Sequence, residues 1–231
     1  MNLAILQALA LHASIFNIKE HQVVDLGIQH PFFSGVMVNP IEGVDINEVV
    51  SETFEVLGRS FMWICDQELE GAARVFPFYE MELKLDELKE PKEAVGEYLM
   101  VSSEDLIDWK KVVGPTYEFD KEDIDAFANL YKGNNNFFHM VVKVNDVVVG
   151  AGTLQIYQDV AILHNITTLR EARGKGIGSR ISFELLSLAK TKNCTRSLIH
   201  GSSGAEKMYQ RLGYKTQKIV FANFFKTPFQ K

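Results

Sequence analysis

The segment of this chain that most restricts its fold runs from Ile162 to Leu186, with the sequence ILHNITTLREARGKGIGSRISFELL. Apolar and β-branched residues at its start predict a buried strand, and apolar residues at helical spacing from Ile177 onward predict a helix. A basic, glycine-rich turn, 170–178, separates the two. This turn therefore lies at a helix N-terminus, where backbone N–H groups and the helix dipole favour an anion such as a phosphate or pyrophosphate.

Two common phosphate loops do not fit this turn. A Walker loop requires Gly-Lys followed by Ser or Thr, whereas Gly176 follows Gly174-Lys175. A dinucleotide fingerprint requires glycine or alanine where Ser179 stands, and no acidic residue lies between Glu184 and Glu206 to hold a ribose hydroxyl. An ordinary glycine-rich strand-to-helix turn without a ligand is the alternative to an anion-binding loop.

The pattern that does fit is Arg-x-x-Gly-x-Gly, formed by Arg173, Gly176 and Gly178. It resembles the loop with which the GCN5-related N-acetyltransferase (GNAT) family wraps the pyrophosphate of acetyl-coenzyme A (acetyl-CoA). A second segment, 202–214 (SSGAEKMYQRLGY), resembles the other motif of that family, a short tyrosine-bearing helix that ends in Leu-Gly-Tyr or Leu-Gly-Phe. The resemblance is strong over roughly 115–225 and weak before it.

The resemblance implies an α/β fold, a mixed and mostly antiparallel sheet with helices on both faces, preceded by a degenerate GNAT-like N-terminal half. We place the boundary near Val113-Gly114-Pro115, so that residues 1–114 form the degenerate domain and residues 115–231 bind acetyl-CoA. The N-terminal half contains no Arg-x-x-Gly-x-Gly loop. We therefore expect no second coenzyme site in it.

Periodicity and capping residues predict the individual elements. In the N-terminal half we expect helices at 3–11, 46–57 (capped by Asp45), 66–73 and 103–111, and strands at 32–38, 61–65 and 81–85. In the C-terminal half we expect a helix from Asp120 to Tyr131, helices at 177–190 and within 202–212, and strands at 138–144, 147–157, 160–168, 197–200 and 218–225. Asn145-Asp146 is typical of a tight hairpin turn.

Acyl transfer from a thioester to an amine needs a held donor, a polarised carbonyl, an uncharged amine and a proton for the departing thiolate. The resemblance assigns pantetheine binding and carbonyl polarisation to the backbone of Ile166, Thr167 and Thr168. It assigns the phosphates to the turn residues Arg173, Gly174, Lys175, Gly176, Ile177, Gly178 and Ser179.

Tyr209 matches the tyrosine that protonates the coenzyme A thiolate in this family, and a phenol is protonated at neutral pH. The alternative is a tyrosine that only packs on the sheet. Ser202 stands where relatives have a residue that contacts the pantetheine, and it is also a candidate N-cap for the helix of Tyr209.

The general base is left open by the sequence. The central strand offers His164, with Asp159 before it and no glutamate, and a histidine has a suitable pKa range. His164 can instead be a hydrogen-bonded core residue; His200 is an equal candidate, and deprotonation through water is a third route. Glu171 places a negative charge near the anion site where relatives often have Gln or Arg.

The net charge of −6 divides unevenly along the sequence. Residues 1–115 carry 8 basic and 20 acidic side chains, and residues 116–231 carry 16 basic and 10 acidic ones. A positive C-terminal half suits a ligand with several phosphates, and an acidic N-terminal half would favour a cationic amine, unless the acids only solvate the surface. Nucleic acid is not an expected partner.

Other features place the chain in a broad class. No apolar run reaches membrane-spanning length, and 3–11 lacks the preceding basic residues of a signal peptide. Cys65 and Cys194 are far apart, without metal-ligand spacing, which indicates buried thiols in a reducing cytoplasm and no metal site. Trp63 and the aromatic residues of 76–79 could line an acceptor pocket or belong to a core.

These observations favour a cytoplasmic N-acetyltransferase that uses acetyl-CoA and a primary amine of a small molecule or peptide, and that could form a homodimer. A non-catalytic module that senses acyl-CoA or serves as a scaffold is the alternative from another class. Transfer of a longer acyl group, or use of a carrier-protein donor, is a third. The acceptor itself cannot be identified from the sequence, because binding loops vary on a fixed fold.

Overall fold

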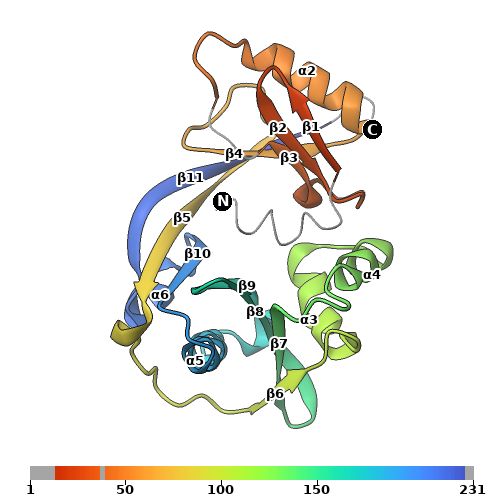
Figure 1. Ribbon diagram of the computed structural model, residues 1–231. Coiled ribbons are helices and arrows are strands. Elements are labelled where there is room, and N and C mark those ends of the chain that lie inside the picture. The colour runs from red at the N-terminus through yellow and green to blue at the C-terminus, as the bar shows by residue number, and fades with distance from the viewer. Residues whose placement is uncertain (1–13, 37–39, 227–231) are drawn as a thin grey trace. The chain divides into compact units, whose positions relative to one another are not determined.

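The computed structural model describes residues 14–36 and 40–226, which divide into two compact units (Figure 1). Unit 1 comprises Met1–Tyr79 and Lys218–Lys231, and unit 2 comprises Glu80–Gln217. None of the helices within the described residues is long and apolar enough to cross a membrane. The expected helix at 3–11 lies outside the described residues.

Unit 1 contains strands in the order β1-β2-β3-β4-β11 and the helix α2. The pair β3–β4 is parallel, and the other pairs are antiparallel. The bounds are β1 Ser14–Ile18, β2 His21–Asp25, β3 Ser34–Val36, α2 Ile46–Leu57, β4 Phe61–Cys65, and the two strands shared with unit 2, β5 Arg74–Lys84 and β11 Lys215–Phe225.

The helix α2 has the bounds that its capping pattern predicts. The Asp45 carboxylate accepts a hydrogen bond from the Asn47 N–H at 2.8 Å, and Gly58 ends the helix in the left-handed conformation. Its apolar side packs on a core that includes Phe61 and Trp63, both fully buried. Trp63 is therefore a core residue and does not line an acceptor pocket, whereas Phe76 is exposed.

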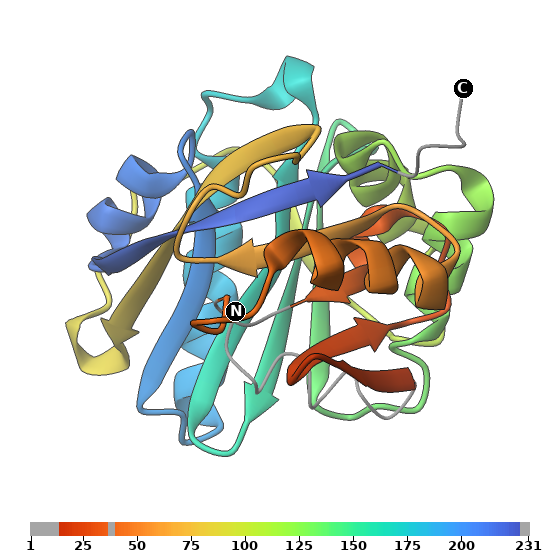
Figure 2. The ribbon, with the colours of Figure 1, turned by 90° about the horizontal axis from the view of Figure 1, so that it is seen from above.

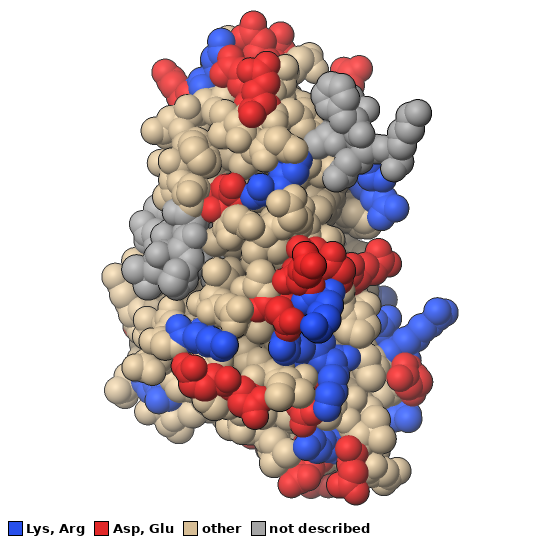
Figure 3. Space-filling view, turned by 90° about the vertical axis from the view of Figure 1, so that its right-hand side faces the viewer, with Lys and Arg blue, Asp and Glu red and all other residues tan. Residues whose placement is uncertain are grey.

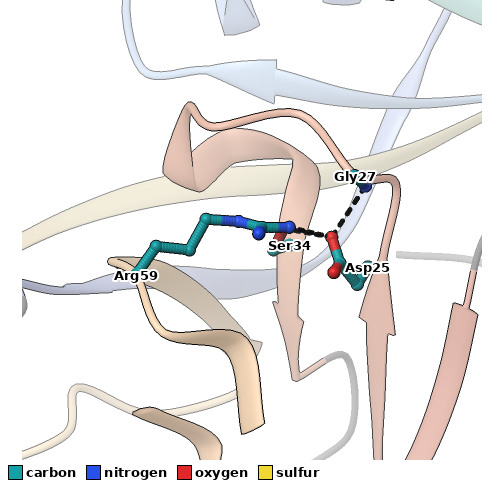
Figure 4. A network of polar contacts seen from close by, with 4 residues as sticks. All are labelled: Asp25, Gly27, Ser34 and Arg59. Atoms are coloured by element: carbon teal, nitrogen blue, oxygen red, sulfur yellow. Dashed lines mark hydrogen bonds and ion pairs between the residues drawn. The ribbon is translucent and has the colours of Figure 1, made fainter. Parts of the chain in front are cut away.

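A buried polar network joins β2, β3 and the turn before β4 (Figure 4). One carboxylate oxygen of Asp25 accepts hydrogen bonds from the Gly27 N–H at 2.7 Å, from the Ser34 hydroxyl at 2.9 Å and from Arg59. The Arg59 guanidinium also donates to Ser34 Oγ at 3.1 Å. Since both charged side chains are more than four-fifths buried, each needs the other to compensate its lost hydration.

Unit 2 contains strands in the order β5-β10-β9-β8-β7-β6, of which β9–β10 is parallel and the pairs from β6 to β9 are antiparallel. The strands β7, β8 and β9, green to teal in Figure 2, lie side by side. The bounds are β6 Glu97–Val101, α3 Ile107–Tyr117, α4 Lys121–Asn129, β7 Phe137–Val144, β8 Val147–Tyr157, β9 Val160–Thr168, α5 Ile177–Thr191, β10 Arg196–Ser202 and α6 Glu206–Leu212.

Helices cover both faces of this sheet, as expected (Figure 1). Successive residues of β8 point to opposite faces. A Cβ on Gly152 would lie 2.5 Å from Ile181 of α5, whereas the neighbouring Thr153 accepts a hydrogen bond from Trp109 of α3 at 3.1 Å. The helix α5 therefore packs on one face and α3 on the other.

Most predicted elements of the C-terminal half are confirmed. The bounds of β8 and β9 are as predicted, and both residues of the Asn145-Asp146 turn have positive φ, as in a type I′ hairpin. The Asp120 side chain caps α4, but the helix ends at Asn129 rather than at Tyr131. Hydrogen bonds of the tighter i to i−3 type continue the chain from Leu130 to Lys132.

Two predictions for the N-terminal half are wrong. Residues 66–73 form a loop instead of a helix, because the Leu69 N–H donates to the Asn223 side chain and the Ala73 N–H to the Phe224 carbonyl. Residues 32–38 were expected to form one strand, but a 3₁₀ turn occupies Pro31–Phe33 and the strand is reduced to Ser34–Val36. Residues 37–38 lie outside the described residues.

The expected helix at 103–111 begins later, at Ile107, and continues to Tyr117. The Ser102 side chain accepts a hydrogen bond from the Glu104 N–H, and the Asp105 side chain accepts one from the Ile107 N–H. These bonds keep 102–106 in turns. The expected boundary at Val113-Gly114-Pro115 thus falls inside α3, and the chain changes units after Tyr79 and after Gln217 instead. The strands β1, β2 and β6 were not predicted.

The charge contrast between the sequence halves does not coincide with the two units. Unit 2 contains 18 basic and 20 acidic side chains, because it includes the acidic segment 80–114. On its side with α3 and α4, Lys and Arg side chains lie among Asp and Glu side chains (Figure 3). Lys110 pairs with Asp125 there at 2.6 Å, and Lys143 with Asp108 at 3.0 Å.

We predict that Arg59→Met lowers the free energy of unfolding by about 3 kcal/mol, because it leaves the buried Asp25 carboxylate without its ion partner. Urea unfolding followed by circular dichroism measures the change. Arg74→Met, a substitution of an exposed arginine in the same unit, is the matched control and should change stability by less than about 0.5 kcal/mol. Equal stability of the two variants would contradict a structural role for the pair.

Candidate active site

The first turn of α5 has no side-chain cap, unlike α2 and α4, which begin with capping aspartates. Its N-cap residue is Gly176, with φ of 80°, and no acidic residue lies in the first turn. The Arg180 N–H makes the first intrahelical bond, to the Gly176 carbonyl at 3.0 Å. The N–H groups of 177–179 therefore have no intrahelical acceptor and can bind an anion.

The turn before α5 has the geometry that its glycines predict. Gly174 and Gly176 both lie in the left-handed region, with φ of 77° and 80°. A Cβ on Gly174 would meet nothing within 4 Å, so glycine is favoured there by the positive φ and not by a lack of space. The Arg173 Nε donates to the Thr168 carbonyl at 3.0 Å and ties the turn to the end of β9.

The side chains of this turn differ in what they can offer a ligand. Arg170, Arg173, Lys175 and Glu171 are exposed, so the three cations and the carboxylate of the loop are all accessible. Ile177 is 2% exposed, and its side chain belongs to the core. Only its backbone can therefore contact a phosphate.

The strands β9 and β10 separate part-way along their length. Within the described residues they pair only through Arg196↔Val160, Ser197↔Ala161 and Leu198↔Ile162, yet β9 continues to Thr168 and β10 to Ser202. Beyond these three pairs, the described residues of β9 and β10 form no ladder with each other. Ile166 to Thr168, the residues predicted to contact pantetheine, lie in this separated part of β9.

Tyr209 lies on α6 and is 4% exposed. Its ring packs against Gly201, where a Cβ would be 3.1 Å from the ring, and against Tyr214 with a centroid distance of 5.5 Å. Burial and the nearby Tyr214 raise the pKa of its hydroxyl well above 10, while the Ser182 hydroxyl lowers it. The phenol is therefore protonated at neutral pH and available as a donor.

Ser202 does not cap α6. The helix begins at Glu206, its N-cap residue is Ala205, and no side chain caps it. The Ser202 carbonyl instead accepts the Ala205 N–H at 2.9 Å, which forms a turn between β10 and α6. The Ser202 hydroxyl is exposed, and its contact with pantetheine stays a prediction.

His164 is half-buried on β9 and its Nε2 lies 2.8 Å from Gln155 Oε1. An amide oxygen only accepts hydrogen bonds, so Nε2 carries the proton and Nδ1 is the basic atom. Burial, His200 and His139 lower the pKa of His164 to about 4. The ring is therefore neutral at neutral pH and is a weak base.

His200 lies on β10 next to the separated part of β9. His200 is two residues past Leu198 and His164 is two residues past its ladder partner Ile162, so both side chains point to the face that this pair occupies. Its Nε2 is 3.5 Å from the Glu80 carboxylate, and both side chains are partly exposed. A carboxylate at this distance favours the imidazolium that forms when a histidine accepts a proton.

Sequence reasoning missed the polar residues that continue this row onto β8 and β7. Thr153 pairs with both His164 and His139 in the ladders, and its hydroxyl lies 3.0 Å from His139 Nδ1. His139 is fully buried, and burial lowers its pKa to about 4. Polar residues inside otherwise apolar strands were the signal that could have indicated this row.

The two cysteines are buried free thiols, as predicted. Burial raises the pKa of both Cys65 and Cys194, so neither is an activated nucleophile.

Comparison with known proteins agrees with the geometry of unit 2. Residues 103–214 match the model of the acetyltransferase (GNAT) family, which includes β9, the glycine turn, α5 and α6. These residues form a GNAT domain. A Bacillus subtilis protein described as uncharacterized protein YyaT is 34% identical over 83 residues, which are 36% of this chain and 56% of that protein.

Solved structures extend the similarity of fold beyond the GNAT domain. A GCN5-related N-acetyltransferase from Kribbella flavida matches with a TM-score of 0.68 at 17% identity, over 96% of this chain and 93% of the other. A functionally unknown conserved protein from Staphylococcus epidermidis matches with a TM-score of 0.68 at 12% identity, over 96% and 97%. The predicted fold class is confirmed.

We predict that the native pKa of His164 is near 4, which a titration of its imidazole proton resonances by NMR measures directly. An unfolded histidine titrates near 6.5, so the unfolded chain binds more protons between about pH 6.5 and 4. Stability is therefore full above pH 6.5 and falls toward pH 4, by up to about 1.4 kcal/mol per pH unit for this group.

His164→Gln should make stability less dependent on pH in this window, as measured by urea unfolding at several pH values. His139 contributes a slope of the same sign, because burial also lowers its pKa to about 4. The double variant should therefore have the flattest profile. A measured pKa near 6.5 for His164 would show that water solvates the ring, and would restore it as a candidate base.

Proposed function

We propose that this chain is an N-acetyltransferase, in which the amine of a small molecule or peptide directly attacks acetyl-CoA in a ternary complex. The observation that carries the proposal is the uncapped N-terminus of α5 beside the separated strands β9 and β10. The helix N-terminus can bind a pyrophosphate, and the edge of β9 that is not paired with β10 can pair with the amides of an extended arm. Together they suit an acyl donor that contains both groups.

The chain's own groups fit this donor. Backbone N–H groups of 177–179 bind the pyrophosphate, and Arg173 and Lys175 supply exposed positive charge beside it. The backbone of Ile166 to Thr168 pairs with the amides of the pantetheine arm. Acetyl-CoA supplies an acetyl group that is activated as a thioester.

Two groups act on the charge that develops during transfer. A backbone N–H of β9 stabilises the oxyanion, and one such donor is worth about 3 kcal/mol. Tyr209 donates its hydroxyl proton to the sulfur of the leaving thiolate, and the proton that the attacking nitrogen loses as the amide forms returns to the Tyr209 oxygen. Burial raises the pKa of this phenol, which keeps it protonated until the thiolate forms.

We assign the general base to His200 rather than to His164. The ring of His164 is hydrogen-bonded to Gln155 and has a pKa of about 4, so it holds a proton weakly. His200 has a carboxylate partner, Glu80, that stabilises its protonated form. It takes the proton of the ammonium, directly or through one water, and leaves a neutral amine.

Isothermal titration calorimetry with acetyl-CoA tests the donor. We expect binding that Gly176→Asp weakens at least tenfold, a loss of about 1.4 kcal/mol, because the new carboxylate occupies the helix N-terminus and repels phosphate. Gly43→Asp is the matched control, since Gly43 has φ of 83° and an added Cβ there meets nothing within 4 Å. Absence of binding by the natural protein would overturn the proposed function.

Tyr209→Phe tests the acid. We expect the turnover number for acetyl transfer, followed by thiol release in an amine screen, to fall about a hundredfold while the Kd for acetyl-CoA stays unchanged. Tyr214→Phe is the control, because it removes another buried hydroxyl, bonded to Ser197 at 2.6 Å. It should lower stability but not turnover.

Different results would point to the other functions. Binding of acetyl-CoA without turnover by the natural protein with any amine would support a non-catalytic sensor. Faster transfer from succinyl-CoA or a long-chain acyl-CoA than from acetyl-CoA would show that the protein transfers a longer acyl group.

A further inference from the structure

The ladder between β8 and β9 contains an irregularity at one position. Ala151 pairs with Thr167 and Thr153 pairs with His164, so Asn165 and Ile166 together oppose Gly152. This two-against-one pairing is a β-bulge, which bends a strand and redirects its peptide groups. The bulge lies where β9 has already separated from β10.

The bulge has an unfavourable backbone conformation. Asn165 has φ of 52°, in the left-handed region, within a strand. Asparagine tolerates this region better than most residues, but the conformation persists only where neighbouring groups hold it. The contacts of Asn165 therefore decide how firmly the bulge is fixed.

One side chain holds Asn165 from the face that carries α3. The Asn165 Nδ2 donates a hydrogen bond to the hydroxyl of Tyr131 at 3.1 Å. Tyr131 follows α4 and is 2% exposed. Its ring packs on His139 with a centroid distance of 4.7 Å and on Phe137 at 4.9 Å, both on β7. The tyrosine thus anchors the bulge to the body of the sheet.

The opposite face holds the bulge by close packing. A Cβ on Gly152 would lie 2.8 Å from Ile166 Cδ1 and 2.5 Å from Ile181 Cγ2, so Ile166 fills the space that glycine leaves under α5. Asn165 and Ile166 are thereby fixed on opposite faces. The direction of the peptide group between them follows from both contacts.

We propose that Tyr131 is a positioning residue for acyl transfer. Through its hydrogen bond to Asn165 it fixes the bulge and aims the Ile166 N–H at the carbonyl oxygen of the bound acetyl group. The proposal rests on the proposed function. It assigns Tyr131 a much larger effect on the chemical step than on donor binding, because Tyr131 lies on the face away from α5 and the other proposed donor contacts, at Thr167, Thr168 and the first turn of α5, do not involve the bulge.

A double-mutant cycle tests this assignment. Tyr131→Phe keeps the ring and removes the hydroxyl, and should lower kcat roughly tenfold while the Kd for acetyl-CoA changes less than about twofold. Asn165→Gly keeps the left-handed backbone without the side chain. In that background Tyr131→Phe should have no further effect on kcat, because the bond through which the tyrosine acts is already absent.

Asn193→Gly is the matched control, because Asn193 is also left-handed, with φ of 63°, in the turn after α5. It should leave kcat unchanged. Thermal unfolding shows whether each variant is folded. A loss of kcat in this control equal to that in Asn165→Gly would overturn the proposal, as would additive effects in the cycle.

A readout without substrate separates this inference from the proposed function. The amide resonance of Ile166 should shift in Tyr131→Phe and exchange faster with solvent, while the amides of β7 stay unchanged. An unchanged Ile166 resonance overturns the positioning role even in an active enzyme. A natural protein that binds no acetyl-CoA overturns the proposed function, whatever the Ile166 resonance does.

Discussion

The close approach of α5 to β8 is the contact on which the rest of the GNAT domain depends. Gly150 and Gly152 supply it, since a Cβ on either would meet an isoleucine of α5 at 3.0 Å or less. The helix can then lie low on the sheet, and its first turn comes next to the end of β9. Because Gly152 also faces the bulge, one glycine serves both the helix packing and the strand geometry. Any larger residue there would displace the two together.

The candidate site lies where a strand ladder stops early and a helix begins without a side-chain cap. The ladder between β9 and β10 stops after Leu198 and Ile162, and α5 begins without the capping aspartate that α2 and α4 have. In unit 1, by contrast, a side chain meets such a need, because Asn223 accepts the Leu69 N–H. Backbone groups held in place without protein partners are what a ligand of amides and phosphates requires.

The sequence was most informative where local chemistry decides structure. The capping of α2 by Asp45, the turn at Asn145-Asp146 and the strand-turn-helix at 160–191 were all predictable, because each depends on neighbouring residues. It failed at 66–73, where donors bond to β11 more than 150 residues away. The row of His164, Thr153 and His139 arises only from strand register, which no single segment encodes.

The uncapped helix also has a consequence for the lifetime of the folded chain. A capping side chain satisfies part of a helix's first N–H groups without a ligand, whereas those of α5 are left to water or a bound anion. A ligand that binds only the folded form adds RT ln(1 + [L]/Kd) to stability, so its concentration would set how often α5 frays. The abundance of a protein with such a helix would then follow the supply of the anion that binds it.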